Sequence, residues 1–249
     1  MRVRRRRIVM GGMAFRVMET MAPVRSARVT VVLIHGIGMS HRYLASLHRE
    51  LALATRVVSV DLPGFAGLPK PRADVDIPQM AAALADALAT LGDGRLVLVG
   101  HSMGAQWAVE VAIQQPVLVA GLVLIGPVTD DKRQTLGGQA RALALDTVGE
   151  TPAINAVVFT DYVRCGVRWY LTQVRHMLAF PMWRRLGAVA MPVLIIRGDK
   201  DPVSGGEWCE SLRRRAQFGR LVELPGQHHV VQQSAPVAVA SEISRWAGF

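Results

Sequence analysis

Short apolar runs, separated by polar and glycine-rich turns, recur along the chain and predict a parallel β-sheet. The runs lie at 30–34, 56–60, 95–99, 121–125, 192–197 and 221–224. Most are continuous stretches of valine, leucine and isoleucine rather than alternating patterns, which is typical of strands buried on both faces.

Longer segments with helical spacing lie between these runs, at 41–54, 77–91 and 105–115. Strands that alternate with helices through short turns indicate a parallel sheet covered by helices on both faces. Near the N-terminus, 5–10 and 13–18 predict a β-hairpin that turns at Gly11-Gly12.

The stretch 126–189 breaks this rhythm, because it is too long for a loop and is mostly helical in composition. We therefore expect an α/β core formed by 1–125 and 190–249, with a helical insertion at 126–189. No part of it is recognisable from sequence as a broad apolar lid. Most of its large apolar side chains are expected to form its own core: Phe159, Tyr162, Trp169, Tyr170, Met177, Phe180, Met182 and Trp183.

Composition narrows the class of protein. The chain has 249 residues, 51% of them hydrophobic and 19% charged, which suits one α/β domain with an insertion and argues against disorder. No apolar run approaches the ~18 residues that span a bilayer, so we expect no stable membrane insertion. Cys165 and Cys209 are far apart and lack metal-ligand spacing, so ordinary thiols are expected.

The net charge of +10 does not by itself indicate a nucleic-acid partner. The basic residues are spread along the chain, and no RNA- or DNA-binding motif accompanies them. The dense run Arg4 to Arg7 is interpreted as the solvated start of a first strand. The apolar residues Ile8 to Met10 are ended at once by Gly11-Gly12, too early for a secretory signal, so a cytoplasmic protein is expected. The sequence carries no signal for an oligomeric state.

Gly100-His101-Ser102-Met103-Gly104 carries the candidate chemistry. It follows the run 95–99 and precedes the helix 105–115, which is the strand, G-x-S-x-G, helix arrangement of a nucleophile elbow. A serine hydroxyl is a weak nucleophile and must be held where a base can reach it. Glycine at both ends leaves room for the sharp turn. The start of the following helix directs N–H groups and a positive dipole toward a developing oxyanion.

An acid and a histidine follow the serine in chain order. The run 192–197 leads into a loop with Asp199 and Asp201, and 221–224 leads into His228-His229. Both loops follow the carboxyl ends of strands, where ligands bind in open α/β sheets. Asp130 and Asp131, which follow the run 121–125, are alternative acids.

With these motifs the chain resembles the α/β-hydrolase superfamily, and in particular serine esterases and ring-cleavage-product hydrolases with a helical cap. The resemblance runs from about Val29 to the C-terminus and implies that the insertion covers the serine. Asp201-Pro202 fits the acid motif of the family, glycine, two residues, aspartate and often proline, which implies Asp201 rather than Asp199.

The same resemblance implies that His229 is the base, because a proline usually follows seven residues after the histidine and Pro236 stands there. His228 then occupies a place where relatives usually have glycine. This departure leaves open that His228 and His229 exchange roles.

His35-Gly36-Ile37-Gly38 follows the run 30–34. In similar proteins the backbone N–H after His-Gly and the one after the serine form the oxyanion hole, which implies Ile37 and Met103. His35 is expected to be structural, with a ring that bridges loops by hydrogen bonds. Asp61 is expected to order the loop that it begins.

The resemblance implies a serine hydrolase that cleaves carboxylic esters of small to medium, fairly apolar substrates through an acyl-enzyme, without metal or organic cofactor. A C–C bond hydrolase of ring-cleavage products is an alternative, in which Arg164, Arg168 or Arg175 would bind a substrate carboxylate. Thioesters and lactones suit the same triad. A non-catalytic ligand-binding protein on the same fold is a further alternative.

Overall fold

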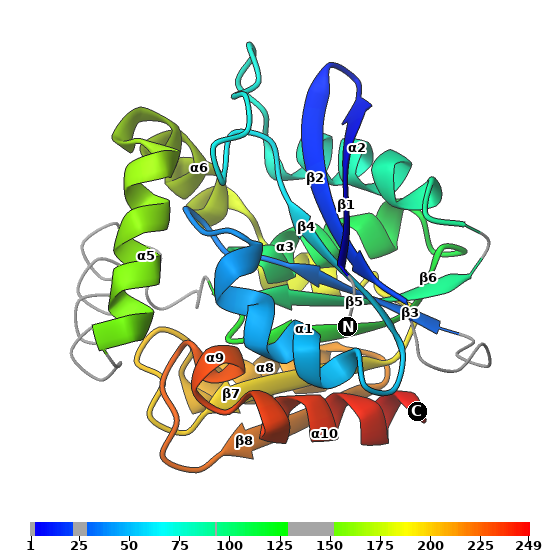
Figure 1. Cartoon of the computed structure of the whole chain (residues 1–249). Helices are drawn as coiled ribbons and strands as arrows, with labels where there is room; N and C mark the ends of the chain where they lie inside the picture. Colours follow the sequence, from blue (N-terminus) through cyan, green and yellow to red (C-terminus); the bar gives the residue numbers. More distant parts are fainter. Residues whose placement is uncertain (1–2, 22–28, 93, 129–151) are drawn as a thin grey trace.

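The computed structural model describes residues 3–21, 29–92, 94–128 and 152–249, with side chains from 156 onward in the last range. The alternative acids Asp130 and Asp131 lie outside the described residues. An eight-stranded sheet forms the centre of the molecule (Figure 1). The strands are β1 (Val3–Met10), β2 (Met13–Thr20), β3 (Val29–Ile34), β4 (Arg56–Asp61), β5 (Arg95–His101), β6 (Val119–Ile125), β7 (Val193–Gly198) and β8 (Gly219–Leu224).

The helices account for most of the remaining described chain. They are the 3-10 turn η1 (His41–Leu44) and the α-helices α1 (Ala45–Leu51), α2 (Ile77–Ala89), α3 (Met103–Gln114), α5 (Pro152–Cys165), α6 (Val167–Ala179), α7 (Met182–Leu186), α8 (Gly206–Arg215), α9 (Val231–Ser234) and α10 (Pro236–Ala247). The segment expected to be one helix at 41–54 is thus a 3-10 turn and a shorter α-helix that ends at Leu51.

The strand order is β1-β2-β4-β3-β5-β6-β7-β8. β1 and β2 form an antiparallel hairpin and β2 pairs antiparallel with β4, while β4, β3 and β5 to β8 run parallel. Gly11 and Gly12 make the hairpin turn with φ of 56° and 75°, a left-handed region that favours glycine. The predicted mostly parallel α/β sheet is confirmed, and Arg4 to Arg7 lie in β1 with mainly exposed side chains.

Apolar side chains on both faces of the parallel strands build two cores. In β3, Val32 and Ile34 face the core beneath α2, α3 and α8, whereas Val31 and Leu33 face the core beneath α1 and α10. Figure 1 shows α1 and α10 in front of the sheet and α2 and α3 behind it. This two-sided burial explains why the strands are continuous apolar runs.

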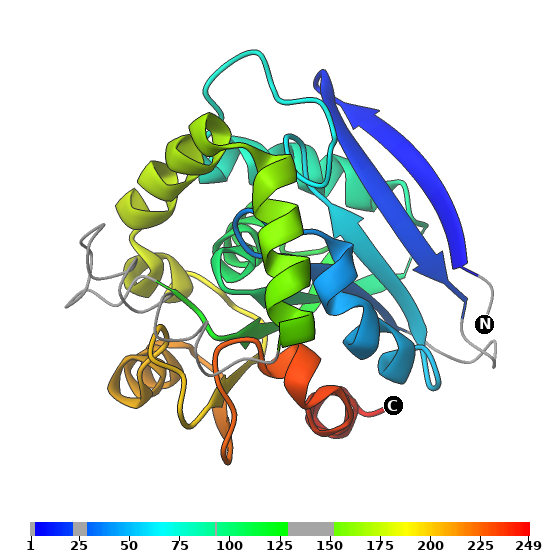
Figure 2. The ribbon, with the colours of Figure 1, turned by 60° about the vertical axis from the view of Figure 1, so that its left-hand side comes forward.

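The parallel strands bring their carboxyl ends to one edge of the sheet, so the loops after β3, β4, β5 and β7 meet there. In sequence, α5, α6 and α7 lie between β6 and β7. Figure 2 shows α5 standing in front of this edge, with α6 leading away from its upper end. None of the helices in the described ranges is both long and apolar enough to cross a membrane.

Candidate active site

Ser102 occupies a sharp turn between β5 and α3. Its backbone has φ 56° and ψ −123°, a conformation that non-glycine residues rarely adopt and that costs about 1–3 kcal/mol. The close approach of neighbouring backbone explains the flanking glycines. A Cβ on Gly100 would collide with the carbonyl oxygen of Gly104, and one on Gly104 would lie 2.5 Å from that of Ile34. The turn therefore has no room for a side chain at either position and holds Ser102 at the tip.

Asp201 and His229 form a buried pair beyond the ends of β7 and β8. The Nδ1 atom of His229 lies 2.8 Å from Oδ2 of Asp201, and the side chains are 4% and 0% exposed. The other oxygen, Oδ1, accepts hydrogen bonds from the backbone N–H groups of Val203 and Ser204 at 2.8 and 2.9 Å. Burial alone would raise the pKa of Asp201, but the charge and hydrogen bond of His229 and these two amides lower it below its usual value.

The neighbouring candidates do not form such a pair. Asp199 is exposed, and its backbone oxygen accepts a hydrogen bond from Arg197. His228 is half-buried, and no described carboxylate lies within ion-pair distance of its ring. Of the two histidines and the two aspartates in these loops, the structure pairs His229 with Asp201.

His101, which the sequence analysis did not single out, links His229 to the serine turn. Its Nε2 atom lies 3.0 Å from the backbone oxygen of His229, and its Nδ1 atom lies 2.7 Å from the hydroxyl of Tyr43. A carbonyl only accepts, so Nε2 carries the proton and Nδ1 accepts from Tyr43. Burial lowers the pKa of His101 to about 3, and the charge of His229 contributes to the same shift. The ring is therefore neutral.

Tyr43 extends this network to the loop after β3. Its hydroxyl oxygen accepts a hydrogen bond of 2.7 Å from the backbone N–H of Gly36 while it donates to His101. The ring of His101 also lies against that of His229, with centroids 4.8 Å apart. One hydrogen-bonded chain thus joins the loop at Gly36, the residue before Ser102 and the backbone of His229. The only sequence signal for it was that His101 stands at the second position of the G-x-S-x-G motif, directly before Ser102.

The loop at Gly36 lies directly beside the serine. A Cβ on Gly36 would be 3.1 Å from Cβ of Ser102. Within the described chain, no hydrogen bond from the backbone N–H of Ile37 is found. Met103 is the first residue of α3, where backbone N–H groups have no acceptor inside the helix. Both amides expected to form an oxyanion hole therefore belong to segments next to Ser102.

His35 connects two loops. The N–H of Leu62 donates to its Nε2 at 3.1 Å, so its Nδ1 carries the proton and donates to the backbone oxygen of Gly36 at 2.8 Å. Burial lowers the pKa of His35, and its ring is fully buried. This is the bridging arrangement expected from the sequence.

Asp61 anchors a second cluster at the end of β4. Its carboxylate accepts hydrogen bonds from the backbone N–H of His41 at 2.7 Å and from Arg16 at 3.0 Å, and it contacts Nδ1 of His41 at 2.9 Å. The hydrogen bonds and charge of His41 outweigh the effect of burial and lower the pKa of Asp61. The cluster ties β2 and the start of η1 to the end of β4.

The helices α5 and α6 pack on the loops that follow β3 and β4. Oγ of Ser40 donates to Oδ2 of the fully buried Asp161 at 2.5 Å. The ring of Tyr162 lies on Gly38, and that of Trp169 lies on Gly64, where a Cβ would be 2.5 Å from the indole. These contacts seat both helices beside the loop that contains Ile37.

Side-chain exposure in these helices refines part of the sequence interpretation. Trp169, Met177, Phe180 and Met182 are buried as expected, but Phe159 and Trp183 are 70% and 40% exposed. The sequence predicted core positions for most of these side chains without saying which, and Phe159 and Trp183 are among those that lie outside the core. Which of these side chains are buried depends on the face of the helix that carries them, because a surface helix buries only one face.

The sequence singled out three arginines and two cysteines, which lie in different environments in the structure. Arg164 and Arg168 are exposed, and Arg175 pairs with Asp74. Cys165 and Cys209 are free and buried, and burial raises the pKa values of their thiols to about 11 and about 12. Among the described residues, no group of three or more histidine, cysteine, aspartate and glutamate side chains is arranged to hold a metal ion.

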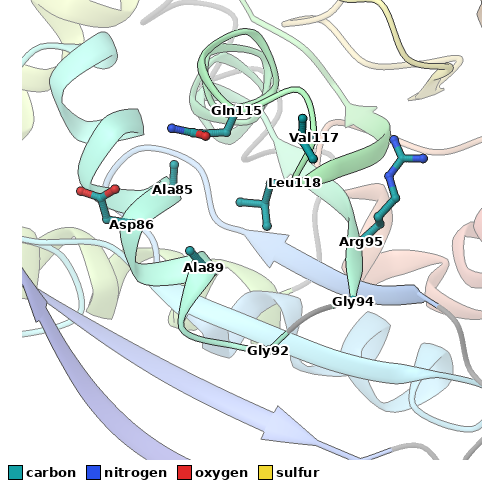
Figure 3. Close-up of a pocket in the computed structure, with 9 residues that line it drawn as sticks. All are labelled: Ala85, Asp86, Ala89, Gly92, Gly94, Arg95, Gln115, Val117 and Leu118. Carbon is teal, nitrogen blue, oxygen red and sulfur yellow. The ribbon is translucent and has the colours of Figure 1, made fainter.

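A surface pocket of about 370 Å³ lies at the other end of β5 (Figure 3). It is formed by the end of α2, the start of β5 at Arg95 and the turn with Val117 and Leu118. Because Ser102 follows the opposite end of the same strand, this pocket is separate from the Ser102 site.

Comparisons with known proteins agree with the fold. The model of the Alpha/beta hydrolase family matches residues 31–242. The pimeloyl-[acyl-carrier protein] methyl ester esterase of Neisseria meningitidis is 28% identical over 225 residues, which cover 80% of this chain and 85% of that protein. The crystal structure of the enol-lactonase from Burkholderia xenovorans superimposes with a TM-score of 0.84 at 18% identity, over 98% of this chain and all of that chain.

An uncharacterised protein of Mycobacterium tuberculosis is 39% identical to the chain over 103 residues. This match covers 41% of the chain and only 30% of the mycobacterial protein.

Proposed function

The chain belongs to the alpha/beta hydrolase family, and we propose that it is a serine hydrolase that cleaves carboxylic esters of small to medium, fairly apolar substrates. The observation that carries this proposal is the connection of three elements at one edge of the sheet. Ser102 stands in a strained turn, His229 pairs with Asp201 at 2.8 Å, and His101 holds the backbone of His229 against that turn.

In the proposed mechanism His229 takes the proton of Ser102 as the hydroxyl attacks the ester carbonyl. Asp201 fixes the tautomer of the imidazole and stabilises the imidazolium that forms. The backbone N–H groups of Ile37 and Met103 bind the tetrahedral oxyanion. His229 then protonates the leaving alcohol, and water repeats the sequence on the acyl-enzyme, with no metal or organic cofactor.

We further propose that the helical insertion, residues 126–189, covers the serine as a cap on a core of 1–125 and 190–249. The contacts of Asp161 with Ser40, of Tyr162 with Gly38 and of Trp169 with Gly64 support this role. A relative with ester hydrolase activity in its name supports the reaction class.

The C–C bond hydrolase of ring-cleavage products is less well supported. That reaction needs a cation to bind the substrate carboxylate, yet Arg164 and Arg168 are exposed and Arg175 pairs with Asp74. Thioester and lactone substrates use the same acyl-enzyme chemistry and are distinguished by assay.

The test is the initial rate of hydrolysis of p-nitrophenyl esters from acetate to palmitate by the wild type and by Ser102→Ala. We expect a rate that peaks at one chain length and falls about 10⁴-fold or more in the variant. Ser46→Ala is the matched control, because the Ser46 hydroxyl accepts an exposed hydrogen bond from Arg49, three residues along the same helix. Turnover near the wild-type level in Ser102→Ala, in a preparation free of other esterases, contradicts the proposal.

Labelling with a serine-directed phosphonate separates the remaining classes, because only an activated serine reacts quickly. Labelling without hydrolysis of any ester indicates another hydrolase substrate, while the absence of labelling indicates a non-catalytic binding protein.

The choice of histidine is tested by His229→Ala and His228→Ala in the same assay. Only His229 pairs with Asp201, so its replacement is expected to lower the rate far more. A larger loss in His228→Ala overturns the assignment.

A further inference from the structure

The corner between α5 and α6 exposes a row of apolar side chains. Phe159, Val163, Val167 and Leu171 are 70%, 66%, 75% and 51% exposed, and each follows the previous one by four residues. A spacing of four keeps Phe159 and Val163 on one side of α5, and Val167 and Leu171 on one side of α6. Gly166 forms the turn that joins the two helices. We call these four residues the apolar stripe.

Most charges on the helices of the apolar stripe are positive, and the acidic Asp74 beyond its end is paired with Arg175 and His176. In residues 156–186 the only acidic residue is Asp161, which is fully buried against Ser40. Arg164 and Arg168 are exposed, and Lys70 reaches the corner, since a Cβ on Gly166 would lie 3.1 Å from its Nζ. The chain as a whole carries a net charge of +10. Exposed apolar side chains with a cationic rim are complementary to a surface with negative headgroups above acyl chains.

The apolar stripe also lies close to the candidate active site. The buried side of the same two helices contacts the loops after β3 and β4, through Tyr162 on Gly38 and Trp169 on Gly64. Figure 1 shows α5 and α6 at the left side of the molecule, and Figure 2, turned so that this side comes forward, shows α5 in front of the sheet. The apolar stripe is therefore on the outer side of the helices whose inner side contacts these loops.

We infer that the apolar stripe and its rim of Lys70, Arg164 and Arg168 bind the surface of an anionic phospholipid bilayer. Binding is peripheral: the apolar side chains enter the headgroup boundary, and the cations contact lipid phosphates. The inference goes beyond the proposed esterase.

The experiment is co-sedimentation with vesicles, using Ser102→Ala as the background so that no lipid is hydrolysed. Vesicles of phosphatidylcholine alone are compared with an equimolar mixture of phosphatidylcholine and phosphatidylglycerol. We expect binding to the mixed vesicles, much weaker binding to phosphatidylcholine, and a loss of binding as salt is raised.

Two variants locate the surface. Phe159→Ser/Leu171→Ser removes apolar contacts and Arg164→Gln/Arg168→Gln removes charge, and each is expected to weaken partition about tenfold or more. Leu53→Ser/Val117→Ser is the matched control, because these apolar side chains are 64% and 86% exposed elsewhere. Circular dichroism checks that each variant is folded. If Phe159→Ser/Leu171→Ser does not fold, Arg164→Gln/Arg168→Gln still tests the inference, because both arginines are exposed.

Three results overturn the inference. The first is no sedimentation with mixed vesicles, and the second is that the apolar variant, the charge variant and the control all bind equally well. The third is a dimer in solution that Phe159→Ser/Leu171→Ser converts to a monomer. The last result assigns the stripe to a second copy of the chain. Failure of the proposed esterase is a separate outcome, since vesicle binding is measured without turnover. Hydrolysis of p-nitrophenyl acetate by the stripe variants in an otherwise wild-type background, without vesicles, is expected to equal that of the wild type.

Discussion

Two histidine–aspartate pairs with fully buried carboxylates lie at the same edge of the sheet, and they differ in what surrounds them. Asp201 pairs with His229 and otherwise accepts hydrogen bonds from the neutral backbone amides of Val203 and Ser204. Asp61 pairs with His41 and also with the guanidinium of Arg16. Both pairs have Nδ1 facing a carboxylate oxygen, at 2.8 and 2.9 Å.

The difference shows why a histidine–aspartate contact is not by itself a catalytic feature. Arg16 already balances the negative charge of Asp61, so the cluster is suited to holding β2, β4 and η1 together. The charge of Asp201 is directed to His229, where it can stabilise a positive imidazole. The surroundings of His229 also include His101 and the serine turn, whereas His41 is 21% exposed at its side chain.

The largest expected contrast is in turnover. Asp201→Asn should lower kcat about 10⁴-fold, because the amide no longer fixes the His229 tautomer or stabilises its positive form. Asp61→Asn should lower kcat by less than about tenfold in the folded protein. Initial rates on p-nitrophenyl butyrate at saturation measure both, and equal losses in the two variants would remove the functional distinction between the pairs.

The next contrast is in stability. Asp61→Asn should lower the free energy of unfolding by about 1–3 kcal/mol, less than for a completely buried pair, because Arg16 is 34% exposed and can regain water. Urea denaturation measures the change, with Asp86→Asn at an exposed carboxylate as the control. A loss no larger than that of the control would show that the Asp61 cluster does not hold the loops.

The smallest effect is the pH dependence of this stability difference. The folded pKa of Asp61 lies below the usual 3.8, so the ionised carboxylate stabilises the fold above that pH, and the contribution is lost as pH falls through the folded pKa. Melting temperatures of wild type and Asp61→Asn should therefore keep a constant gap down to about pH 4 and converge below it. A gap that widens with acid contradicts the sign of the shift.

Local patterns in the sequence were sufficient for the fold. The apolar runs identified β3 to β8, and Gly11-Gly12 marked the hairpin, because strand period and turn residues are local properties. The Ser102 turn was also predictable, because its G-x-S-x-G motif stands between a predicted strand and a predicted helix. The network of His101 and Tyr43 was not, because it joins residues 58 and 128 positions apart in sequence.

The sequence by itself determined the alternating strands and helices and the order of Ser102, Asp201 and His229 along the chain. Only the tertiary structure decided that His229 rather than His228 meets Asp201, that Arg16 balances Asp61, and that Phe159 is exposed. The physical reason is the range of the interactions. Propensity and turn geometry act between neighbours, whereas burial and charge pairing depend on which distant segments the sheet brings to the same edge.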